Sequence, residues 1–315
     1  MKILVTGGAG FIASHVVDRY IADGHDVVVV DNLATGFREN VNPKATFYEL
    51  DIRDAKIAEV FRDERPEVVN HHAAQMDVRR SVREPLYDAE VNVLGTLRLL
   101  ELSREIGVKR WIYISTGGAV YGEPQSLPVR EDHPINPLSP YGATKHTPEH
   151  YLFIYHSLYG LGSVVLRYAN IYGPRQSPHG EAGVTAIFSE NILLGKACTL
   201  FGDGSKTRDY VFIEDVVRAN VAALSRGDGG IFNIGTGRRT SDFEIFDLVR
   251  NALGKPDLQP AYGEKRPGEI DHIALANDRA REGLGWTPEV SLEDGVRRAT
   301  AFYREKLVRQ GKIPS

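Results

Sequence analysis

The sequence has very little cysteine and no long apolar run. Its 315 residues include one cysteine, Cys198, which excludes an intrachain disulfide and argues against a cysteine-based metal site. No apolar stretch reaches the roughly 20 residues that a membrane-spanning helix needs. The N-terminus begins directly with a strand-like run, with no signal-peptide pattern before it. We therefore expect a cytoplasmic protein without a membrane or metal requirement.

Neither sign of charge dominates. The 38 Lys and Arg residues face 42 Asp and Glu residues, for a net charge of −4, so the chain as a whole has no general attraction for nucleic acid. The length and the 42% hydrophobic content are sufficient for a full core in one large domain or two unequal ones. No repeat or low-complexity tract interrupts the chain.

The N-terminal segment predicts a dinucleotide site. A strand-like run, Lys2–Thr6, leads into the glycine turn Gly7-Gly8-Ala9-Gly10, and a helical pattern extends from about Ile12 to Asp23. The apolar run Asp26–Asp31 then reads as a buried parallel strand that ends in an acid. Glycines at a helix N-terminus let backbone amides approach a pyrophosphate, and Asp31 can bind the ribose hydroxyls of NAD. Because a carboxylate would repel a phosphorylated ribose, NAD is favoured over NADP.

Two further strand ends carry candidate cofactor contacts. After the strand at 45–50, Asp51 and Ile52 could hold an adenine ring between a carboxylate and an apolar wall, although Asp51 could equally cap a following helix. After the strand at 67–72, Ala73 and Gln75 lie in a segment whose small residues suit close approach of a cofactor.

A catalytic pair is predicted at the start of a later helix. Ser139 is a good N-cap and Pro140 suits the first helical position. Tyr141 and Lys145 then lie one turn apart on the same face. An ammonium group that close favours the phenolate, so we expect Tyr141 to act as a base nearer neutral pH than a free tyrosine.

The order of elements predicts an α/β fold. A long helix over Asp88–Ile106, with Asn92 interrupting its apolar pattern, and further strands at 109–115 and 162–168 complete a doubly wound parallel sheet of Rossmann type. We expect residues 1–170 to form the NAD-binding domain, with 210–240 returning to it. Residues 171–315 should form a smaller α+β lobe that binds the substrate.

Seven motifs together resemble one family. They are Thr6–Ile12, Asp51-Ile52-Arg53, Ser115-Thr116, Val120-Tyr121-Gly122, Tyr141-x-x-x-Lys145, Arg167-Tyr168-Ala169-Asn170 and Arg208-Asp209-Tyr210-Val211. In this order they resemble the extended short-chain dehydrogenase/reductases, and most of all the NAD-dependent nucleotide-sugar epimerases. The resemblance extends to Gly285-Trp286-x-Pro288, and so covers nearly the whole chain.

The resemblance implies roles for individual residues. Tyr141 would be the general base and Lys145 its activator and a ligand of the nicotinamide ribose. The positions implied around NAD are Gly7, Gly10, Phe11, Ile12, Asp31, Asn32, Asp51, Ile52, Ala73, Gln75, Asn92, Ser115, Tyr141, Lys145 and Tyr168. Those implied around the nucleotide diphosphate of a UDP-sugar are Asn170, Arg208, Arg266 and Glu269. Surface salt bridges are the alternative for Arg208-Asp209 and Arg266-Glu269.

One departure from the family pattern concerns the catalytic loop. The position where relatives carry a catalytic Ser or Thr falls on Gly117, which has no hydroxyl. We expect Thr116, the preceding residue, to supply it. The alternative is that Thr116 only holds the loop to its strand.

The implied reaction is NAD-dependent 4-epimerisation of a UDP-hexose, UDP-glucose or UDP-galactose, through a transient 4-keto sugar. A 4-epimerase of a UDP-uronate or UDP-N-acetylhexosamine stays open, with Ile273 or Ala274 as the gate for an N-acetyl group. A 4,6-dehydratase is less favoured, because glycines rather than acids follow Thr116. A non-enzymatic NAD-binding sensor would not need the Tyr141–Lys145 pair.

The catalytic helix also suggests self-association. Its apolar residues Tyr151, Leu152, Tyr155 and Leu158 exceed what one sheet contact requires. We expect a homodimer in which this helix and the helix over 88–106 pair across a two-fold axis.

Overall fold

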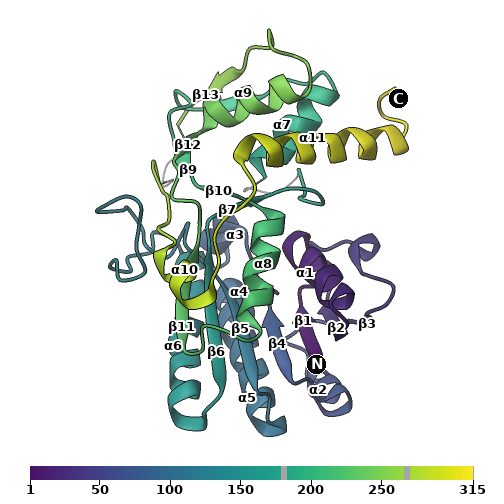
Figure 1. The fold of residues 1–315 in the computed structure, drawn as a ribbon, viewed down its shortest axis with the longest axis vertical. Coiled ribbons are helices and arrows are strands. Elements are labelled where there is room, and N and C mark those ends of the chain that lie inside the picture. Colours follow the sequence, from purple (N-terminus) through teal and green to yellow (C-terminus); the bar gives the residue numbers. More distant parts are fainter. Residues whose placement is uncertain (179–182, 266–269, 315) are drawn as a thin grey trace.

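A single parallel sheet forms the centre of the molecule. The computed structural model describes residues 1–178, 183–265 and 270–314. Over these residues seven parallel strands lie in the order β11-β6-β5-β4-β1-β2-β3 (Figure 1). Their bounds are β1 (Lys2–Thr6), β2 (Asp26–Asp31), β3 (Thr46–Glu49), β4 (Val68–His71), β5 (Arg110–Thr116), β6 (Gly162–Tyr168) and β11 (Gly230–Ile234). The predicted doubly wound α/β sheet is confirmed.

The strand order reverses beside β1, and this places the site. From β1 the chain builds outward through β2 and β3, then returns to the other side of β1 with β4. In register, Thr6 lies beside both Val30 and His71, and Thr116 lies beside Tyr168. The carboxyl ends of the central strands therefore meet at one edge, where ligands bind in open α/β sheets.

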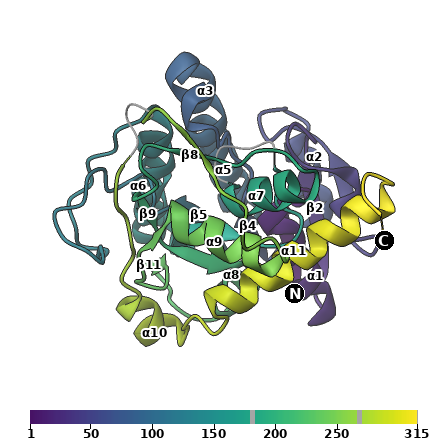
Figure 2. The same cartoon turned by 90° about the horizontal axis from the view of Figure 1, so that it is seen from above.

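Helices cover both faces of the sheet. Alternate strand residues supply two cores: Ile3 and Val5 pack under α1 (Phe11–Ala22) and α8 (Ile213–Ala223), whereas Leu4 and Trp111 face the other side. That second face is covered by α2 (Ile57–Glu64), α5 (Thr96–Ile106) and α6 (Pro140–Tyr159). The view from above shows the two helical layers on either side of the strands (Figure 2).

The helix expected over Asp88–Ile106 is present, and it contains a π-helical turn. After the short helix α3 (Val78–Arg83), the backbone is helical without a break through α4 (Pro85–Ala89), the π-helical turn η2 (Glu90–Gly95) and α5. Asn92 lies within η2. Its Oδ1 accepts from the backbone N–H of Gln75, and its Nδ2 donates to the backbone carbonyl of Gln75. A π turn is a common local adjustment where a helix serves a functional site.

A smaller lobe lies beyond the carboxyl edge of the sheet, at the top of Figure 1. Its helices include α7 (Val184–Leu193), α9 (Asp242–Ala252) and α11 (Leu292–Arg309), which pack on one another. Among the described residues, three two-stranded sheets lie outside the seven-stranded sheet. The remaining elements are η1 (Arg38–Asn40), β7 (Asn170–Tyr172), β8 (Thr199–Phe201), β9 (Thr207–Arg208), β10 (Tyr210–Phe212), β12 (Thr240–Ser241), β13 (Ala261–Gly263) and α10 (Asp278–Leu284).

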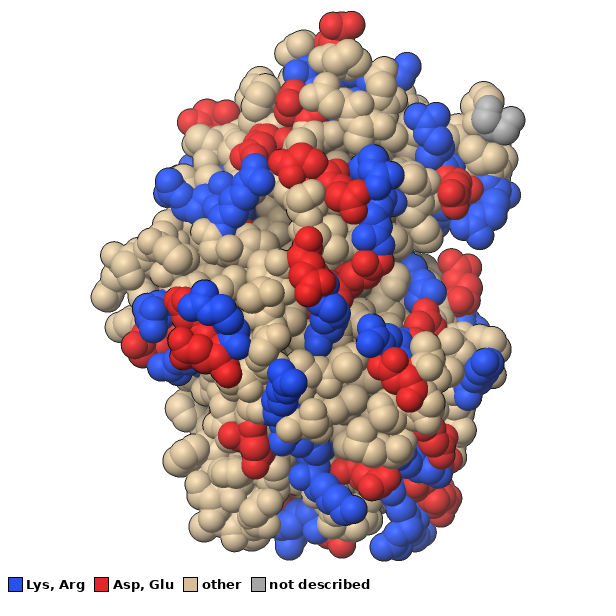
Figure 3. Space-filling model, in the orientation of Figure 1, with Lys and Arg blue, Asp and Glu red and all other residues tan. Residues whose placement is uncertain are grey.

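The chain returns to the sheet within its last third. Helix α8 packs against α1, and β11 pairs with β6 at the edge of the seven-stranded sheet. Within the described parts of the chain no helix has the length and apolarity to cross a membrane. On the face shown in Figure 3, basic and acidic side chains are interspersed rather than gathered by sign.

Candidate active site

The turn between β1 and α1 is a bare backbone cradle. Gly7 has a φ of +71°, and a Cβ added to it would lie 2.8 Å from the backbone nitrogen of Ala73. A Cβ on Gly8 would lie 2.6 Å from Cγ1 of Val29. Gly10 is the N-cap of α1 and, having no side chain, leaves the first-turn amides of Phe11 and Ile12 without a side-chain cap. Such an end accommodates the negative charge of a pyrophosphate.

Asp31 lies at the end of β2 and faces this turn. Its Oδ2 accepts from the backbone N–H of Ala9 at 3.0 Å, and its Oδ1 from that of Leu33 at 2.8 Å. Burial raises the pKa of Asp31 and these two hydrogen bonds oppose that rise. The carboxylate is thus fixed beside the glycine turn, at the place where a Rossmann fold binds the adenosine ribose.

The segment after β3 does not cap a helix. Asp51 accepts from the Arg53 side chain through Nε at 2.9 Å and Nη2 at 2.8 Å, and from Asn32 Nδ2 at 2.9 Å. The Arg53 hydrogen bond, opposed by burial, lowers the pKa of Asp51 to about 2. Because α2 begins only at Ile57 with Lys56 as its N-cap, the capping role considered for Asp51 is excluded.

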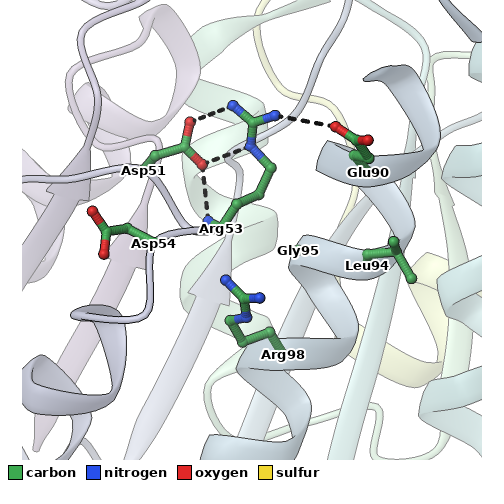
Figure 4. A pocket seen from close by; sticks show the side chains of 7 residues that line it. All are labelled: Asp51, Arg53, Asp54, Glu90, Leu94, Gly95 and Arg98. Atoms are coloured by element: carbon green, nitrogen blue, oxygen red, sulfur yellow. Dashed lines mark hydrogen bonds and ion pairs between the residues drawn. The ribbon is translucent and has the colours of Figure 1, made fainter. Parts of the chain in front are cut away.

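A cavity opens beside Asp51. It has a volume of ≈ 540 Å³ and lies between the loop after β3 and the helical segment η2–α5 (Figure 4). Asp51 and Arg53 form one wall, and Glu90 and Arg98 extend from the opposite helix. Ile52 is buried behind this loop, where its Cδ1 lies 2.8 Å from the position of a Cβ on Gly95. The two predicted adenine contacts therefore lie at the outer end of the site, away from the catalytic helix.

A buried polar network closes the site between β4 and α6. Asn92 donates to the carbonyl of Gln75 at 3.0 Å and to Thr144 Oγ1 at 3.1 Å. Asp88, also buried, accepts from Thr144 Oγ1 at 2.5 Å and from Gln75 Nε2 at 2.7 Å. Neither Asp88 nor Thr144 could be recognised from the sequence, because their contacts depend on α4 and α6 lying side by side.

Helix α6 begins as predicted. Ser139 is its N-cap and accepts from the backbone N–H of Gly142 at 3.2 Å, with Pro140 in the first turn. Lys145 is buried, and its Nζ lies 4.6 Å from the centre of the Tyr113 ring. The Tyr113 hydroxyl donates to the backbone carbonyl of Lys145 at 3.1 Å, which ties α6 to β5.

Tyr141 lies beside Thr116, and the Thr116 hydroxyl acts on the pKa of Tyr141 as a hydrogen-bonding group. Thr116 is the last residue of β5, at the carboxyl end of the strand. Burial raises the pKa of Tyr141 to about 12, opposed by the Thr116 hydrogen bond and reinforced by Asp88. The lowered pKa expected from the neighbouring ammonium is therefore not found in the protein alone, because burial disfavours the phenolate more strongly.

Lys145 lies between two carboxylates. Burial lowers its pKa to about 7, while the charges of Glu149 and Asp88 raise it. Both acids thus favour the charged form of the lysine next to Tyr141, against the cost of desolvation.

Glu149 belongs to a second buried network that sequence reasoning missed. Its carboxylate accepts from Arg167 Nε at 3.0 Å, from Ser115 Oγ at 2.5 Å and lies 3.0 Å from His146 Nδ1. Burial would raise the pKa of Glu149, but hydrogen bonds from His146, Arg167 and Ser115, together with the guanidinium charge, lower it to about 2. The one available signal was its position a further turn beyond Lys145 on α6. Ser115, predicted near the cofactor, has its hydroxyl committed to this network.

The remaining predicted residues lie in four different places. Tyr168 is buried, and its hydroxyl accepts from Asn220 Nδ2 of α8 at 2.6 Å. Asn170 reaches the catalytic loop: its Oδ1 lies 3.9 Å from the position of a Cβ on Gly118. Arg208 lies on β9, and its Nη1 donates to the carbonyls of Thr207 and Asp271 at 3.0 and 3.2 Å. Arg266 and Glu269 lie outside the described residues.

The residues present fit NAD. Along the carboxyl edge of the sheet, from β2 through β1 to β5, Asp31, the glycine cradle and the Tyr141–Lys145 pair follow one another, in the order adenosine ribose, pyrophosphate and reacting ring. Nowhere in residues 1–178, 183–265 and 270–314 do three or more His, Cys, Asp or Glu side chains form a group that could hold a metal ion.

Comparison with known proteins agrees with this geometry. Residues 3–235 match the model of the NAD-dependent epimerase/dehydratase family. The chain is 48% identical to the UDP-glucose 4-epimerase of Mycolicibacterium smegmatis, over 97% of this chain and 99% of that protein.

Two solved structures are similar throughout. The UDP-glucose 4-epimerase of Thermotoga maritima, determined with UDP-glucose, has a TM-score of 0.95 at 50% identity and covers 98% of this chain and 100% of that one. The enzyme of Thermus thermophilus, in complex with NAD, has a TM-score of 0.92 at 45% identity and covers 96% and 99%. The protein therefore belongs to the NAD-dependent epimerase/dehydratase family.

Proposed function

We propose that the protein is a UDP-glucose 4-epimerase that interconverts UDP-glucose and UDP-galactose. The observation that carries the proposal is the placement of Tyr141 beside Thr116, with Lys145 one turn along α6 and the glycine cradle at the same edge of the sheet. The choice of sugar is supported by the names of relatives that are 48–50% identical over nearly the full chain.

Tyr141 would move the proton of the sugar 4-hydroxyl. The glycine cradle and Asp31 would hold NAD, which would supply an acceptor for the hydride of C4 and its donor for return to the other face. Lys145 in its charged form would favour the phenolate of Tyr141, and the carboxylates of Asp88 and Glu149 favour that charged form. Thr116 would hold the sugar hydroxyl within reach of Tyr141, a positioning role in which small displacements are costly.

We propose that the two lobes bind different ligands, as predicted from the sequence. Residues 1–170 and 210–240 would bind NAD, and the remainder would bind the nucleotide of the substrate. Arg208 has its guanidinium oriented by two carbonyls, which suits bidentate contact with a phosphate, and Asn170 points to the same catalytic loop. Arg266 and Glu269 would contact the diphosphate and the uridine ribose.

The test is conversion of UDP-galactose by purified protein without added NAD, followed by chromatography of the nucleotide sugars. We expect UDP-glucose at equilibrium, and NAD in the supernatant after the protein is denatured. UDP-N-acetylglucosamine and UDP-glucuronate should react at least ten times more slowly. Bound NAD without conversion of any of these sugars would contradict the proposal.

The role of Thr116 has its own test. Thr116→Val should reduce turnover about 100-fold, in the range for loss of one transition-state hydrogen bond, and leave the NAD content unchanged. Turnover close to that of the parent would instead favour a purely structural role for Thr116.

We also propose a cytoplasmic homodimer formed through α6 and the neighbouring η2–α5 segment. Leu152 and Tyr155, predicted at this interface, are buried in the protein's own core, so that part of the prediction is corrected. The large hydrophobic residues that α6 leaves exposed are Phe153, Ile154, Leu158 and Tyr159, and Leu94 of η2 is exposed as well. Because exposed apolar patches of this kind mark interfaces, Ile154→Glu should give a monomer by light scattering, whereas Phe37→Glu should not. A monomeric parent protein at micromolar concentration would contradict the proposal.

A further inference from the structure

We propose that Leu275 is a positioning residue of the catalytic loop: it occupies the space beside Gly117 and thereby leaves Thr116 as the loop's hydroxyl toward Tyr141. This inference rests on the proposed function and extends it to a side chain that has no polar atom and lies in a distant part of the sequence.

The space beside Gly117 is filled by Leu275. A Cβ built on Gly117 would lie 2.3 Å from Cδ1, 3.0 Å from Cδ2 and 3.2 Å from Cγ of that leucine. These separations are shorter than the 3.5–4.0 Å at which carbon atoms pack favourably. Because all three atoms of the branched end crowd the position, rotation of one methyl group would not clear it.

The backbone at Gly117 is not what requires glycine. Its φ lies outside the left-handed region, unlike that of Gly7 or Gly122. The neighbouring Gly118, by contrast, has room for a side chain. A Cβ there would have as its nearest atoms Thr116 Oγ1 at 3.8 Å and Asn170 Oδ1 at 3.9 Å. The restriction at 117 therefore comes from the leucine alone.

Leu275 is held in place from two sides. Its side chain has no exposed surface and packs with Val120, Val129 and Ile273. Its backbone N–H donates to Oδ2 of Asp209 at 3.0 Å, and it forms a parallel bridge with Val129.

Asp209 joins this arrangement to the turn that follows β11. The buried carboxylate also accepts from the backbone N–H groups of Thr236 and Gly237, each at 3.0 Å through Oδ2, and from the Thr236 hydroxyl at 2.5 Å through Oδ1. A carboxylate with this many donors fixes the chain that carries Leu275, so the leucine cannot retreat from Gly117 without breaking buried hydrogen bonds.

The catalytic loop consequently has two distinct sides. Thr116 and Asn170 bring oxygen atoms to one side, where Tyr141 lies, and Leu275 covers the other. A hydroxyl placed at position 117 would be usable only if Leu275 were shortened. The exclusion by Leu275 explains why the function of the hydroxyl falls to Thr116 in this chain.

The test is rescue of Thr116→Val by a hydroxyl at position 117. In the T116V background, G117S should give no recovery of kcat while Leu275 is intact. In the T116V/L275A background, G117S should raise kcat at least tenfold over T116V/L275A. G117A is the matched control in both backgrounds and should give no gain, because it adds the same Cβ without a hydroxyl. NAD content and the melting temperature are measured for every variant.

A second readout does not depend on the role of Thr116. With Thr116 present, G117S should lower the melting temperature of the parent by several degrees, and by less than half as much in L275A, as expected for residues in contact. Recovery of T116V by G117S with Leu275 intact would overturn the proposal, as would equal losses of melting temperature in both backgrounds. Near-normal turnover of T116V would contradict the proposed role of Thr116 instead, and the melting temperatures would still decide whether Leu275 excludes a side chain at 117.

Discussion

Two glycine pairs follow strands of the same sheet, and they exist for different reasons. After β1, Gly7 has a left-handed backbone and Gly8 lies against the neighbouring strand, so the turn itself requires glycine. After β5, Gly117 has an ordinary backbone and is restricted by Leu275, which comes from the far end of the chain. The glycine turn after β1 can be recognised from a local sequence motif, and we propose that it binds the cofactor. The glycine pair after β5 depends on tertiary packing, and we propose that it takes part in the reaction.

Substitutions in the two regions should therefore have different consequences. Changes around β5 and α6 should reduce turnover or stability while NAD stays bound, and changes around the β1–α1 turn should reduce NAD binding first.

The largest effect is expected for Tyr141→Phe. The variant loses the proton-transfer group, so kcat should fall about 10³-fold, within the range for general acid–base catalysis. NAD content, measured after denaturation, should stay that of the parent. A variant that lost its NAD together with its activity would break the separation between the two regions.

The next largest effect is expected for Glu149→Gln. Removing one partner of the buried Glu149–Arg167 pair should lower the free energy of unfolding by about 3 kcal/mol at pH 7. The control is Glu84→Gln, which alters an exposed pair with Arg80 and should cost less than about 1 kcal/mol.

The Glu149 effect also has a defined pH dependence. The pKa of Glu149 in the folded protein is about 2, below the ordinary value of 4.5 for a glutamate side chain. Its contribution is therefore fully present above pH 4.5 and is lost as the pH falls toward 2. Chemical denaturation of both proteins at a series of pH values should show the difference between parent and E149Q shrinking over that interval. A difference that is constant with pH would exclude the proposed ionised state.

A smaller effect is expected for Gly7→Ala. The added Cβ would meet the backbone of Ala73 in a left-handed conformation, so the turn must shift, and NAD should bind at least about tenfold more weakly at a stability cost of about 2 kcal/mol. Gly24→Ala is the matched control, because Gly24 has a φ of +84° with nothing within 4 Å of its Cβ position. It should cost about 1 kcal/mol and leave the NAD titration unchanged. Equal NAD affinities for the two variants would show that the cradle is not at Gly7.

The smallest effect is expected for Asp31→Asn. Loss of a charge-assisted hydrogen bond to the ribose should weaken NAD about tenfold and narrow the preference over NADP. Fluorescence titration with both cofactors measures the ratio. Unchanged affinity for both would remove Asp31 from the ribose site.

The local features could be predicted from the sequence. The glycine turn, Asp31 at a strand end and the Ser139-capped helix with Tyr141 and Lys145 each depend on residues a few positions apart. Backbone geometry and periodicity are sufficient for such features. The fold class followed from the same patterns.

What depends on distant residues could not be predicted. The Glu149–Arg167 pair, the Asp88–Thr144 contact and the leucine beside Gly117 join separate elements. Asn92 was recognised as an interruption, yet the π turn around it follows from its bonds to the backbone after β4. The pKa of Tyr141 is raised, opposite to expectation, because burial, which a sequence does not show, has the largest effect on it.

The central claim, that this site inverts C4 of a UDP-hexose, is tested most directly by following the hydrogen at that carbon. UDP-galactose carrying deuterium at C4 is incubated with the protein in ordinary water, and the product is analysed by NMR. We expect UDP-glucose with the deuterium retained at C4, because the hydride leaves and returns within one closed site. Protium from solvent at C4, or deuterium transferred to C6 with loss of water, would contradict the assignment.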